Sequence, residues 1–327
     1  MDTRPKHVHL IEPKSSCDNR PDPGVRTDSR PAPGFPDEAP GLLFAVKDGH
    51  FWFTHRRLAI REAARSCLPG APRARVLDLG CGDGEILAEL SRHFHAVGLD
   101  PRVNDLSLAR RRGATRLVAA QGDHPPFSRC FDLVGLFDVL EHVADDSGLL
   151  GRAAALAVPG GFVLLTVPAD PRLWSKFDRY AGHYRRYTRR VLEGLLRDAG
   201  LEPVRILPLF RILWPLARIQ ALFGRRKEVA DPEREYRVTG IWNHLLRAAL
   251  AVERRLSGAS ERGIGTSWLA VARIPAVPTR PPTGDERRAA SWKVGPGSLS
   301  LPRSVILSAA KDLLPRLRVV LPARGRL

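Results

Sequence analysis

The chain has 327 residues and a mass of 36.1 kDa, which leaves room for one large domain or two small ones with an ample core. Hydrophobic residues make up 43% and charged residues 27%, a globular composition that excludes a wholly disordered chain. We expect no membrane span and no secretory signal, because no uncharged apolar run is long enough. Four cysteines without Cys-x-x-Cys spacing indicate neither disulfides nor a zinc site, so we expect a cytoplasmic protein that binds no metal.

The formal net charge of +17 is spread unevenly along the chain. Residues 1–40 hold six basic and seven acidic residues, residues 285–327 hold nine and three, and the segment between them carries +12. Such a charge keeps an anionic partner or an anionic membrane surface among the candidates. Arginine greatly outnumbers lysine, however, and a high genomic arginine usage would produce the same charge.

The two ends differ from the middle in composition. Residues 1–40 are rich in Pro, Asp, Arg and Ser without apolar periodicity, so they cannot bury enough surface to offset their ordering entropy. We expect a disordered leader there and a folded domain over residues 41–274. Residues 275–327 begin Pro-rich and continue as a basic tail, for which we favour an unstructured extension over a docking role.

The middle of the chain alternates between short apolar strands and helices. This order predicts βαβ units and a doubly wound, Rossmann-like α/β sheet with helices on both faces. Pro159-Gly160-Gly161 is expected to turn the chain before the fifth strand. The expected strands are 75–79, 95–100, 115–120, 131–137 and 162–167, and the expected helices are 85–92, 103–112, 149–158 and 189–199, the last capped by Thr188 and ended by Gly200.

A glycine-rich turn joins the first strand to the first helix, where the backbone of such folds approaches a nucleotide. Its pattern is D-x-G-x-G-x-G, and the dinucleotide fingerprint is broken by Glu85. Carboxylates in this loop repel a phosphate but attract a cation, which favours S-adenosylmethionine, a sulfonium without phosphate. The residues that we expect to bind this cofactor here are Asp78, Gly80, Cys81, Gly82 and Gly84.

Acidic residues also follow the next three strands. Asp100, followed by Pro101, ends the second strand about 20 residues after the glycine turn, where a carboxylate can hold the ribose hydroxyls. Asp123 follows the third strand, near the place of the adenine, and Asp138 ends the fourth. Each one alone could be a turn residue or a helix cap. Because parallel strands end at one edge of the sheet, we expect them to converge on one cofactor crevice.

Residues 42–273 resemble a class I S-adenosylmethionine-dependent methyltransferase of the broad small-molecule type. The resemblance rests on VLDLGCGDG at Val76–Gly84, FDLVGLFDVLEHV at Phe131–Val143 and the segment Pro159–Pro168. Leu173–Asp178 and Gly182–Thr188 are similar to a bacterial subgroup found among envelope-polysaccharide or lipid genes. The family implies a seven-stranded sheet with an antiparallel last strand, for which residues 264–273 fit. It also implies a leading helix over the cofactor, in which Arg56 meets the methionyl carboxylate.

Two histidines are candidates for the general base that a hydroxyl acceptor would need. His142 follows Asp138, and a bracing role in the loop is the alternative. His183 stands in the loop after the fifth strand, where a substrate should lie. Beside it, Arg185 and Arg186 could clamp an anionic acceptor, or could instead form ion pairs with nearby aspartates.

An insertion over residues 208–262 follows the sixth strand and contains a strongly apolar segment next to basic residues. It predicts either a helical lid over the acceptor or, through residues 208–227, a peripheral contact with the inner face of the membrane. We favour the lid, because Pro215 should interrupt a long membrane helix. An apolar lid suits a lipid-like acceptor.

The sequence therefore predicts an S-adenosylmethionine-dependent methyltransferase that acts on a small-molecule, lipid or saccharide acceptor without an obligate protein partner. A nucleic-acid methyltransferase is the alternative enzyme, and a cofactor-binding protein without catalysis is the third hypothesis. Nucleic-acid enzymes that methylate amines carry an Asn/Asp-Pro-Pro-aromatic element after the fourth strand. Here His124-Pro-Pro-Phe127 follows the third strand, where it cannot frame a flipped base, so a nucleic-acid substrate is disfavoured.

Overall fold

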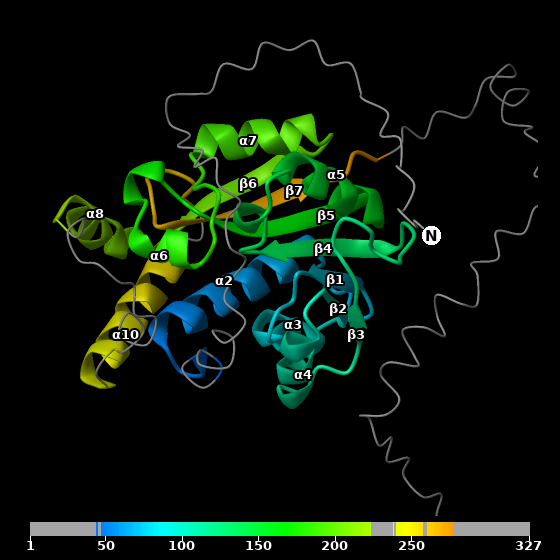
Figure 1. Ribbon diagram of the computed structural model, residues 1–327, viewed down its shortest axis with the longest axis horizontal. Helices are drawn as coiled ribbons and strands as arrows, with labels where there is room; N and C mark the ends of the chain where they lie inside the picture. Colours follow the sequence, from blue (N-terminus) through cyan, green and yellow to red (C-terminus); the bar gives the residue numbers. More distant parts are fainter. Residues whose placement is uncertain (1–43, 45–46, 224–237, 239, 258–259, 277–327) are drawn as a thin grey trace, which may run out of the picture. The chain divides into compact units, whose positions relative to one another are not determined.

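The computed structural model describes residues 44, 47–223, 238, 240–257 and 260–276 (Figure 1). The predicted leader and almost all of the predicted tail lie outside the described residues. The described part contains a single seven-stranded sheet in the order β3-β2-β1-β4-β5-β7-β6. The strands are β1 (Arg75–Leu79), β2 (His95–Asp100), β3 (Leu117–Ala119), β4 (Phe131–Phe137), β5 (Ala157–Pro168), β6 (Glu202–Leu209) and β7 (Ser267–Arg273).

The sheet is mixed, as expected. Strands β1 to β5 all run in the same direction, and β7 pairs antiparallel with both β5 and β6. The doubly wound, Rossmann-like fold and its antiparallel last strand are therefore confirmed. Strand order reverses between β1 and β4, and open sheets of this kind bind their ligands beyond the carboxyl ends of the strands at that point.

Helices cover both faces of the sheet (Figure 1). One hydrophobic core joins the sheet to α5 and α7, and a second joins it to α2, α3 and α4, with α10 packed on α2. The helices are α2 (Phe51–Cys67), α3 (Glu85–Ser91), α4 (Val103–Arg111), α5 (Asp146–Leu156), α6 (Lys176–Tyr180), α7 (Arg189–Asp198), α8 (Trp214–Phe223) and α10 (Gly240–Ser257), with short 3-10 turns η1 (Leu140–His142), η2 (Pro171–Leu173) and η3 (Arg211–Leu213).

Several predicted boundaries differ from the structure for identifiable reasons. Helix α5 begins three residues before the expected start, because the Asp145 side chain accepts a hydrogen bond from the Gly148 backbone N at 2.8 Å and caps it. Pro159-Gly160-Gly161 is not a turn before β5 but lies inside that strand, where the pairing with β4 shifts register. Thr188 caps α7 as predicted, with its hydroxyl accepting from Val191 N at 3.2 Å.

As expected, the apolar segment around Pro215 does not form one long helix: β6 ends at Leu209, η3 follows, and α8 begins at Trp214. Pro215 is the second residue of α8, in the first turn, where a missing backbone N–H and a fixed φ angle favour helix initiation. None of the described helices combines the length and the apolar character that crossing a bilayer requires.

Candidate cofactor and acceptor site

The loop between β1 and α3 depends on three glycines. Gly80, Gly82 and Gly84 have φ angles of 81°, 50° and 76°, which residues with a side chain rarely adopt. A Cβ atom at Gly80 would lie 2.7 Å from a methyl group of Val139, and one at Gly84 would lie 2.6 Å from the Cβ atom of Ala109. At Gly82 no described atom lies within 4 Å of that position. Glycines at 80 and 84 therefore let the loop pass close to Val139 and Ala109, while the loop stays open at Gly82.

Asp100, at the end of β2, holds this loop in place. Its Oδ2 atom accepts a hydrogen bond from the Gly82 backbone N at 2.9 Å, and its Oδ1 atom accepts one from Arg102 N at 2.9 Å. Gly80 N donates to the Leu99 carbonyl at 2.7 Å. Each carboxylate oxygen can accept a further hydrogen bond, so the geometry leaves room for the expected ribose contact of Asp100, which stays a prediction.

Asp78 lies one residue before the end of β1 and is 1% exposed. Neither of its carboxylate oxygens has a hydrogen-bond partner among the described residues. Burial raises the pKa of this carboxyl to about 7, against the opposing charge of Arg56, and the carboxylate of Asp100 raises it further. An unpartnered buried carboxylate is costly unless a ligand pairs with it. The start of the glycine loop is therefore suited to a ligand that carries an ammonium group.

Three other residues that were predicted to bind the cofactor differ from one another in their surroundings. The Cys81 side chain is 7% exposed and packs in the core, and burial raises the pKa of its thiol, so the side chain is a neutral packing group. Pro101 is exposed directly after β2, and Asp123 is exposed after β3, with its carboxylate 3.1 Å from the His124 ring. Their contacts with a cofactor stay predictions.

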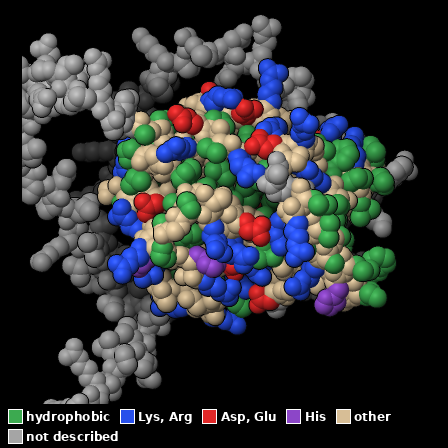
Figure 2. Space-filling model, turned by 180° about the vertical axis from the view of Figure 1, so that it is seen from behind, with side chains coloured by type: hydrophobic (Ala, Val, Ile, Leu, Met, Phe, Trp, Pro, Cys, Tyr) green, Lys and Arg blue, Asp and Glu red, His purple; other side chains and the backbone are tan. Residues whose placement is uncertain are grey.

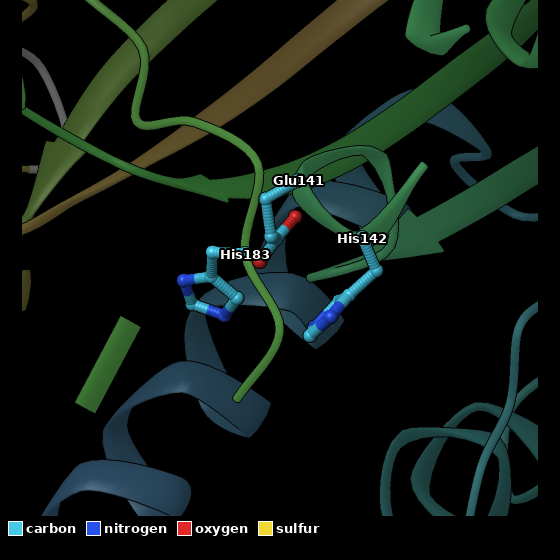
Figure 3. Close-up of side chains that lie close together, drawn as sticks. All are labelled: Glu141, His142 and His183. Atoms are coloured by element: carbon cyan, nitrogen blue, oxygen red, sulfur yellow. The ribbon is translucent and has the colours of Figure 1, made fainter. Parts of the chain in front are cut away.

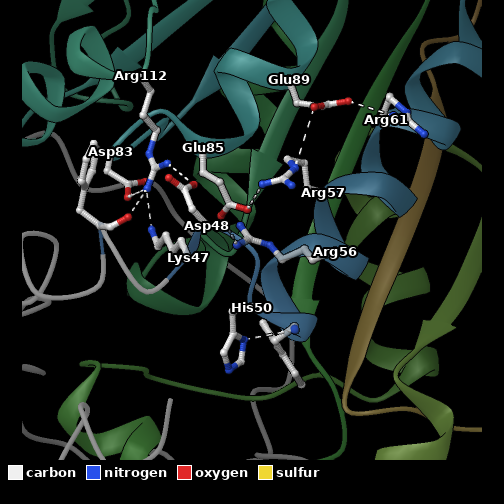
Figure 4. Close-up of polar contacts among 12 residues, drawn as sticks. Lys47, Asp48, His50, Arg56, Arg57, Arg61, Asp83, Glu85, Glu89 and Arg112 are labelled. Atoms are coloured by element: carbon white, nitrogen blue, oxygen red, sulfur yellow. Dashed lines mark hydrogen bonds and ion pairs between the residues drawn. The ribbon is translucent and has the colours of Figure 1, made fainter. Parts of the chain in front are cut away.

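A polar network that sequence analysis missed joins the segment before α2 to the glycine loop (Figure 4). The Asp83 carboxylate pairs with Lys47 at 2.9 Å and with Arg112 at 3.3 Å, and Arg112 also pairs with Asp48 at 2.8 Å. The partners of Asp83 lie 36 and 29 residues away in the chain, a separation at which no local pattern reveals the pair. The network fixes where α2 begins beside the loop.

Arg56 extends from α2 to the end of β4. Its Nε atom lies 2.9 Å from Asp138 Oδ2, and its Nη2 atom donates to the Phe137 carbonyl at 3.3 Å. Asp138 has a φ angle of 57° and accepts a hydrogen bond from the Thr166 hydroxyl at 3.0 Å. The structure thus brings two predicted cofactor residues, Arg56 and Asp138, together as an ion pair. Their contacts with a cofactor stay predictions.

On the other half of the edge, Asp178 of α6 organises the loop that follows β5. This side chain is completely buried. Burial alone would raise the pKa of its carboxyl, but the Arg186 guanidinium and His183 hold that pKa well below its usual range. Its oxygens accept from Ser175 N (2.7 Å), Ser175 Oγ (2.9 Å), His183 Nδ1 (2.9 Å), Arg186 Nε (2.8 Å) and Arg186 Nη2 (3.0 Å).

The two predicted catalytic histidines lie together (Figure 3). Their ring centroids are 4.7 Å apart, with the rings nearly perpendicular. The ionised Asp178 carboxylate can only accept, so His183 Nδ1 must carry the proton, and the lone pair of the neutral ring is on Nε2. Burial lowers the pKa of His142 to about 4, assisted by the neighbouring His183, so His142 is neutral near pH 7.

Glu141 completes this group and was not predicted. It is 1% exposed, its Oε2 atom has no hydrogen-bond partner among the described residues, and burial together with the Asp138 charge raises the pKa of its carboxyl well above the usual value. Glu141, His142 and His183 each offer one potential metal ligand within 4.8 Å of the others. Ligands about 2.1 Å from one ion lie at most roughly 4.2 Å apart, so these side chains would have to move to hold one.

The two predicted substrate arginines are both engaged in ion pairs. Arg186 binds Asp178 through two nitrogens and donates to the Ala169 carbonyl at 3.1 Å. Arg185 lies 3.0 Å from Asp146 Oδ1 and donates to the Ala144 carbonyl at 2.8 Å. This is the arrangement of the alternative interpretation, in which the arginines hold the loop. Binding of an anionic acceptor by either residue stays a prediction.

The predicted insertion packs on the loop after β5 and on α2. Trp214, the first residue of α8, donates from Nε1 to Asp170 Oδ2 at 2.9 Å, which attaches α8 to the loop after β5. Leu209 is 7% exposed and belongs to the core, and Phe210 stacks on Trp52 of α2 at 3.7 Å between ring centroids. Trp52 is therefore a packing residue.

A doubly wound sheet with a glycine loop after β1 and carboxylates at the ends of β1, β2 and β4 defines a class of α/β proteins that bind a nucleoside-containing cofactor at the switch point. Residues 52–206 match the sequence profile of a family described as a methyltransferase domain. These residues, just under half of the chain, are thus similar to methyltransferase domains, which agrees with the resemblance to the class I S-adenosylmethionine-dependent methyltransferases, and S-adenosylmethionine is the methyl donor of that class.

The sequence is also similar to curated small-molecule methyltransferases. A trans-aconitate 2-methyltransferase of Deinococcus radiodurans is 33% identical over 126 residues, which cover 38% of this chain and 49% of the relative. A ubiquinone biosynthesis O-methyltransferase of Bradyrhizobium is 34% identical over 134 residues, covering 37% of this chain and 49% of the relative. The chain thus spans about half the length of the curated relatives it matches.

Solved structures show a weaker likeness. An S-adenosylmethionine-dependent methyltransferase from Thermotoga maritima has a TM-score of 0.47 and 16% identity, covering 72% of this chain and 93% of that one. The magnesium protoporphyrin IX methyltransferase of Synechocystis has a TM-score of 0.39 and 16% identity, covering 48% and 74%. These likenesses are too weak to transfer a ligand or a substrate to this chain.

Proposed function

We propose that the protein transfers a methyl group from S-adenosylmethionine to a hydroxyl group of a small-molecule, lipid or saccharide acceptor. The observation that carries this proposal is the pair of contrasting carboxylates at one edge of the sheet. Asp78 is buried without a partner beside the glycine loop, and Asp178 fixes the proton of His183 on the acceptor side. The Asp78 carboxylate suits a cationic cofactor, and the Asp178 carboxylate orients His183 as a general base would require.

Three residues would bind the cofactor. Asp78 would accept hydrogen bonds from its ammonium group, Asp100 would accept those of the ribose hydroxyls, and Arg56 would pair with its carboxylate. S-adenosylmethionine supplies, when bound, an electrophilic methyl group on a sulfonium. Because the glycine loop is fixed by Asp100 and by the Asp83 network, the cofactor would be positioned by a preformed backbone, and orientation alone can supply on the order of 7 kcal/mol of the barrier reduction.

On the acceptor side, His183 would take the proton of the attacking hydroxyl at Nε2. The Asp178 carboxylate holds the opposite ring nitrogen as a donor, which orients the ring and would stabilise the imidazolium that forms. His142, neutral near pH 7, would face the acceptor as a hydrogen-bonding group. With both arginines of the loop in ion pairs, an uncharged or lipid-like acceptor fits better than a strongly anionic one.

The curated relatives support the chemical class of the acceptor, since both are named as enzymes that methylate small molecules. We place the activity in the cytoplasm, because Cys67, Cys81 and Cys130 are free thiols in the described part of the chain. The His124-Pro-Pro-Phe127 element follows β3, as expected, away from the acceptor side, and this disfavours a nucleic-acid substrate.

The test is incubation of the full chain with isotope-labelled S-adenosylmethionine and an extract of its own host, followed by mass spectrometry of the labelled products. We expect a labelled lipid, saccharide or other small molecule. Label in RNA would favour the nucleic-acid alternative instead. Calorimetry in parallel separates the remaining outcomes: binding without transfer indicates a non-catalytic cofactor-binding protein, and absence of binding contradicts the proposed cofactor site.

A further inference from the structure

Most of the large hydrophobic side chains that are exposed among the described residues lie on η3, α8 and α10. Nine of the eleven large hydrophobic side chains that are exposed there lie between residues 212 and 256, each 45–76% exposed. Isolated exposed hydrophobic residues are ordinary, but a contiguous group marks an interaction surface. Figure 2 shows hydrophobic side chains gathered along the edge of the molecule formed by these two helices, with Lys and Arg side chains beside them.

Helix α10 exposes an unusual number of large apolar side chains on its outward side. Its inward side packs Leu250, which is 0% exposed, into the core, and polar side chains beside it bind α2 and the residues before it: Asn243 accepts from Phe51 N at 2.8 Å and Arg254 pairs with Glu62 at 3.0 Å. Its outward side mixes basic residues with large apolar ones that are 53–76% exposed, namely Ile241, Trp242, Leu245, Val252 and Leu256. The outward face therefore costs free energy in water unless something covers it.

Helix α8 adds a second apolar stripe. Leu216, Ile219 and Leu222 follow one another at intervals of three residues and are 51–56% exposed. Its opposite side is attached to the loop after β5, because Trp214 donates to Asp170 and Arg218 donates to the Arg172 carbonyl at 3.4 Å. The stripe is thus held outward by contacts with the acceptor loop.

The charges around this surface have one sign. Among the described residues of η3, α8 and α10, the only acidic side chain is Glu253, which is 7% exposed and accepts hydrogen bonds from the backbone N atoms of Arg211 and Ile212. The basic side chains Arg247 and Arg255 are exposed. Apolar residues mixed with cations and without exposed anions match the interface of an anionic bilayer, in which Trp and aliphatic side chains enter and Arg meets the headgroups.

We propose that the outward faces of α8 and α10 form a docking surface for a membrane that contains anionic phospholipids. These helices would lie on the bilayer, because neither is long and apolar enough to cross it. A second copy of the chain would bring the same arginines together, and the tail over residues 285–327, with nine basic and three acidic residues, carries the same sign of charge as the surface. Since α8 is attached to the loop that holds His183, docking would place the acceptor side next to the lipid.

Vesicle flotation of the full chain tests this surface without knowledge of the methyl acceptor. We expect the protein to float with vesicles of phosphatidylcholine and phosphatidylglycerol, to remain unbound with phosphatidylcholine alone, and to dissociate at high salt. The variants Leu216→Glu/Ile219→Glu and Ile241→Glu/Trp242→Glu should each reduce partitioning about tenfold or more, because two large side chains no longer enter the bilayer. Val204→Glu, a site 49% exposed on β6, is the matched control and should float like the wild type.

Two outcomes would overturn the proposal. One is a full chain that does not float with anionic vesicles, or patch variants that float as well as the control. The other is a wild type that sedimentation shows to be a dimer and that the patch substitutions convert to a monomer without any lipid binding. If a patch variant does not fold, the fluorescence of the wild type decides: anionic vesicles should shift its tryptophan emission to the blue, and Trp242→Phe should remove that shift.

Discussion

Two buried aspartates at the same edge of the sheet have opposite environments. Asp78 is 1% exposed with no hydrogen-bond partner among the described residues, and burial raises the pKa of its carboxyl to about 7. Asp178 is completely buried and accepts from Ser175, His183 and Arg186; burial alone would raise the pKa of its carboxyl, but Arg186 and His183 hold it below the usual range. The carboxylate beside the glycine loop is thus suited to a ligand, whereas the carboxylate in the loop after β5 is part of the scaffold.

The largest effect is expected from Asp178→Asn. This change leaves the guanidinium of Arg186 without its carboxylate, and removing one partner of a buried pair costs about 3 kcal/mol or more. Urea unfolding should therefore show a lower free energy of unfolding for this variant. Glu193→Gln, which breaks an ion pair with Arg197 on the surface of α7, is the control and should change it by less than about 0.5 kcal/mol. Equal losses in both variants would contradict a scaffold role for Asp178.

His183→Ala should reduce turnover about 100-fold once an acceptor has been identified, because the proposed base is removed. The affinity for S-adenosylmethionine should stay the same, since His183 lies in the acceptor half. Initial-rate kinetics and calorimetry measure the two effects separately. His95→Ala, at an exposed site at the start of β2, serves as the control for a lost histidine. Turnover of His183→Ala at the rate of this control would remove His183 from the mechanism.

Asp78→Asn should behave in the opposite way to Asp178→Asn. Because its pKa is raised, folded Asp78 retains a proton that the unfolded chain has already released, so its burial lowers the free energy of unfolding as the pH rises from about 4 to about 7. Asparagine does not ionise, so the variant lacks the free-energy cost of burying an ionised carboxylate, and at pH 8 it should be at least as stable as the wild type. Its affinity for S-adenosylmethionine should fall by about 2 kcal/mol. Chemical denaturation and calorimetry check the two parts, and a destabilised variant with unchanged affinity would reverse the assignment.

Arg185→Ala should give the smallest effect. Its ion pair with Asp146 is half-buried and also supported by the Tyr187 hydroxyl, which donates to Asp146 Oδ2 at 2.9 Å. We expect a loss of no more than about 1 kcal/mol in the free energy of unfolding. A thermal melt measures it. A drop as large as that of Asp178→Asn would mean that the loop is held equally by both arginines.

Sequence reasoning predicted the features that depend on local chemistry. The positive φ angles of Gly80, Gly82 and Gly84 follow from the glycines themselves, and the cap at Thr188 follows from its residue type. The order of strands and helices followed from the apolar pattern. These are the features that a short segment of chain determines by itself.

Long-range pairing was not predictable in the same way. The Lys47–Asp83 pair joins residues 36 positions apart, and the contacts of Asp178 are set by how α6 and the following loop fold over β5. Pro215 was expected to interrupt a long helix, but its place in the first turn of α8 was not predicted. The unpartnered state of Asp78 likewise became visible only with the positions of all its neighbours.

Calorimetric titration of the full chain with S-adenosylmethionine at pH 7, in two buffers that differ in ionisation enthalpy, tests the central claim most directly. A bound ammonium group favours the ionised form of Asp78, so binding should release protons and the observed enthalpy should depend on the buffer. In Asp78→Asn this additional release should be absent while weaker binding persists. An identical buffer dependence in wild type and variant, or the absence of binding to the wild type, would contradict the proposal that Asp78 receives the cofactor.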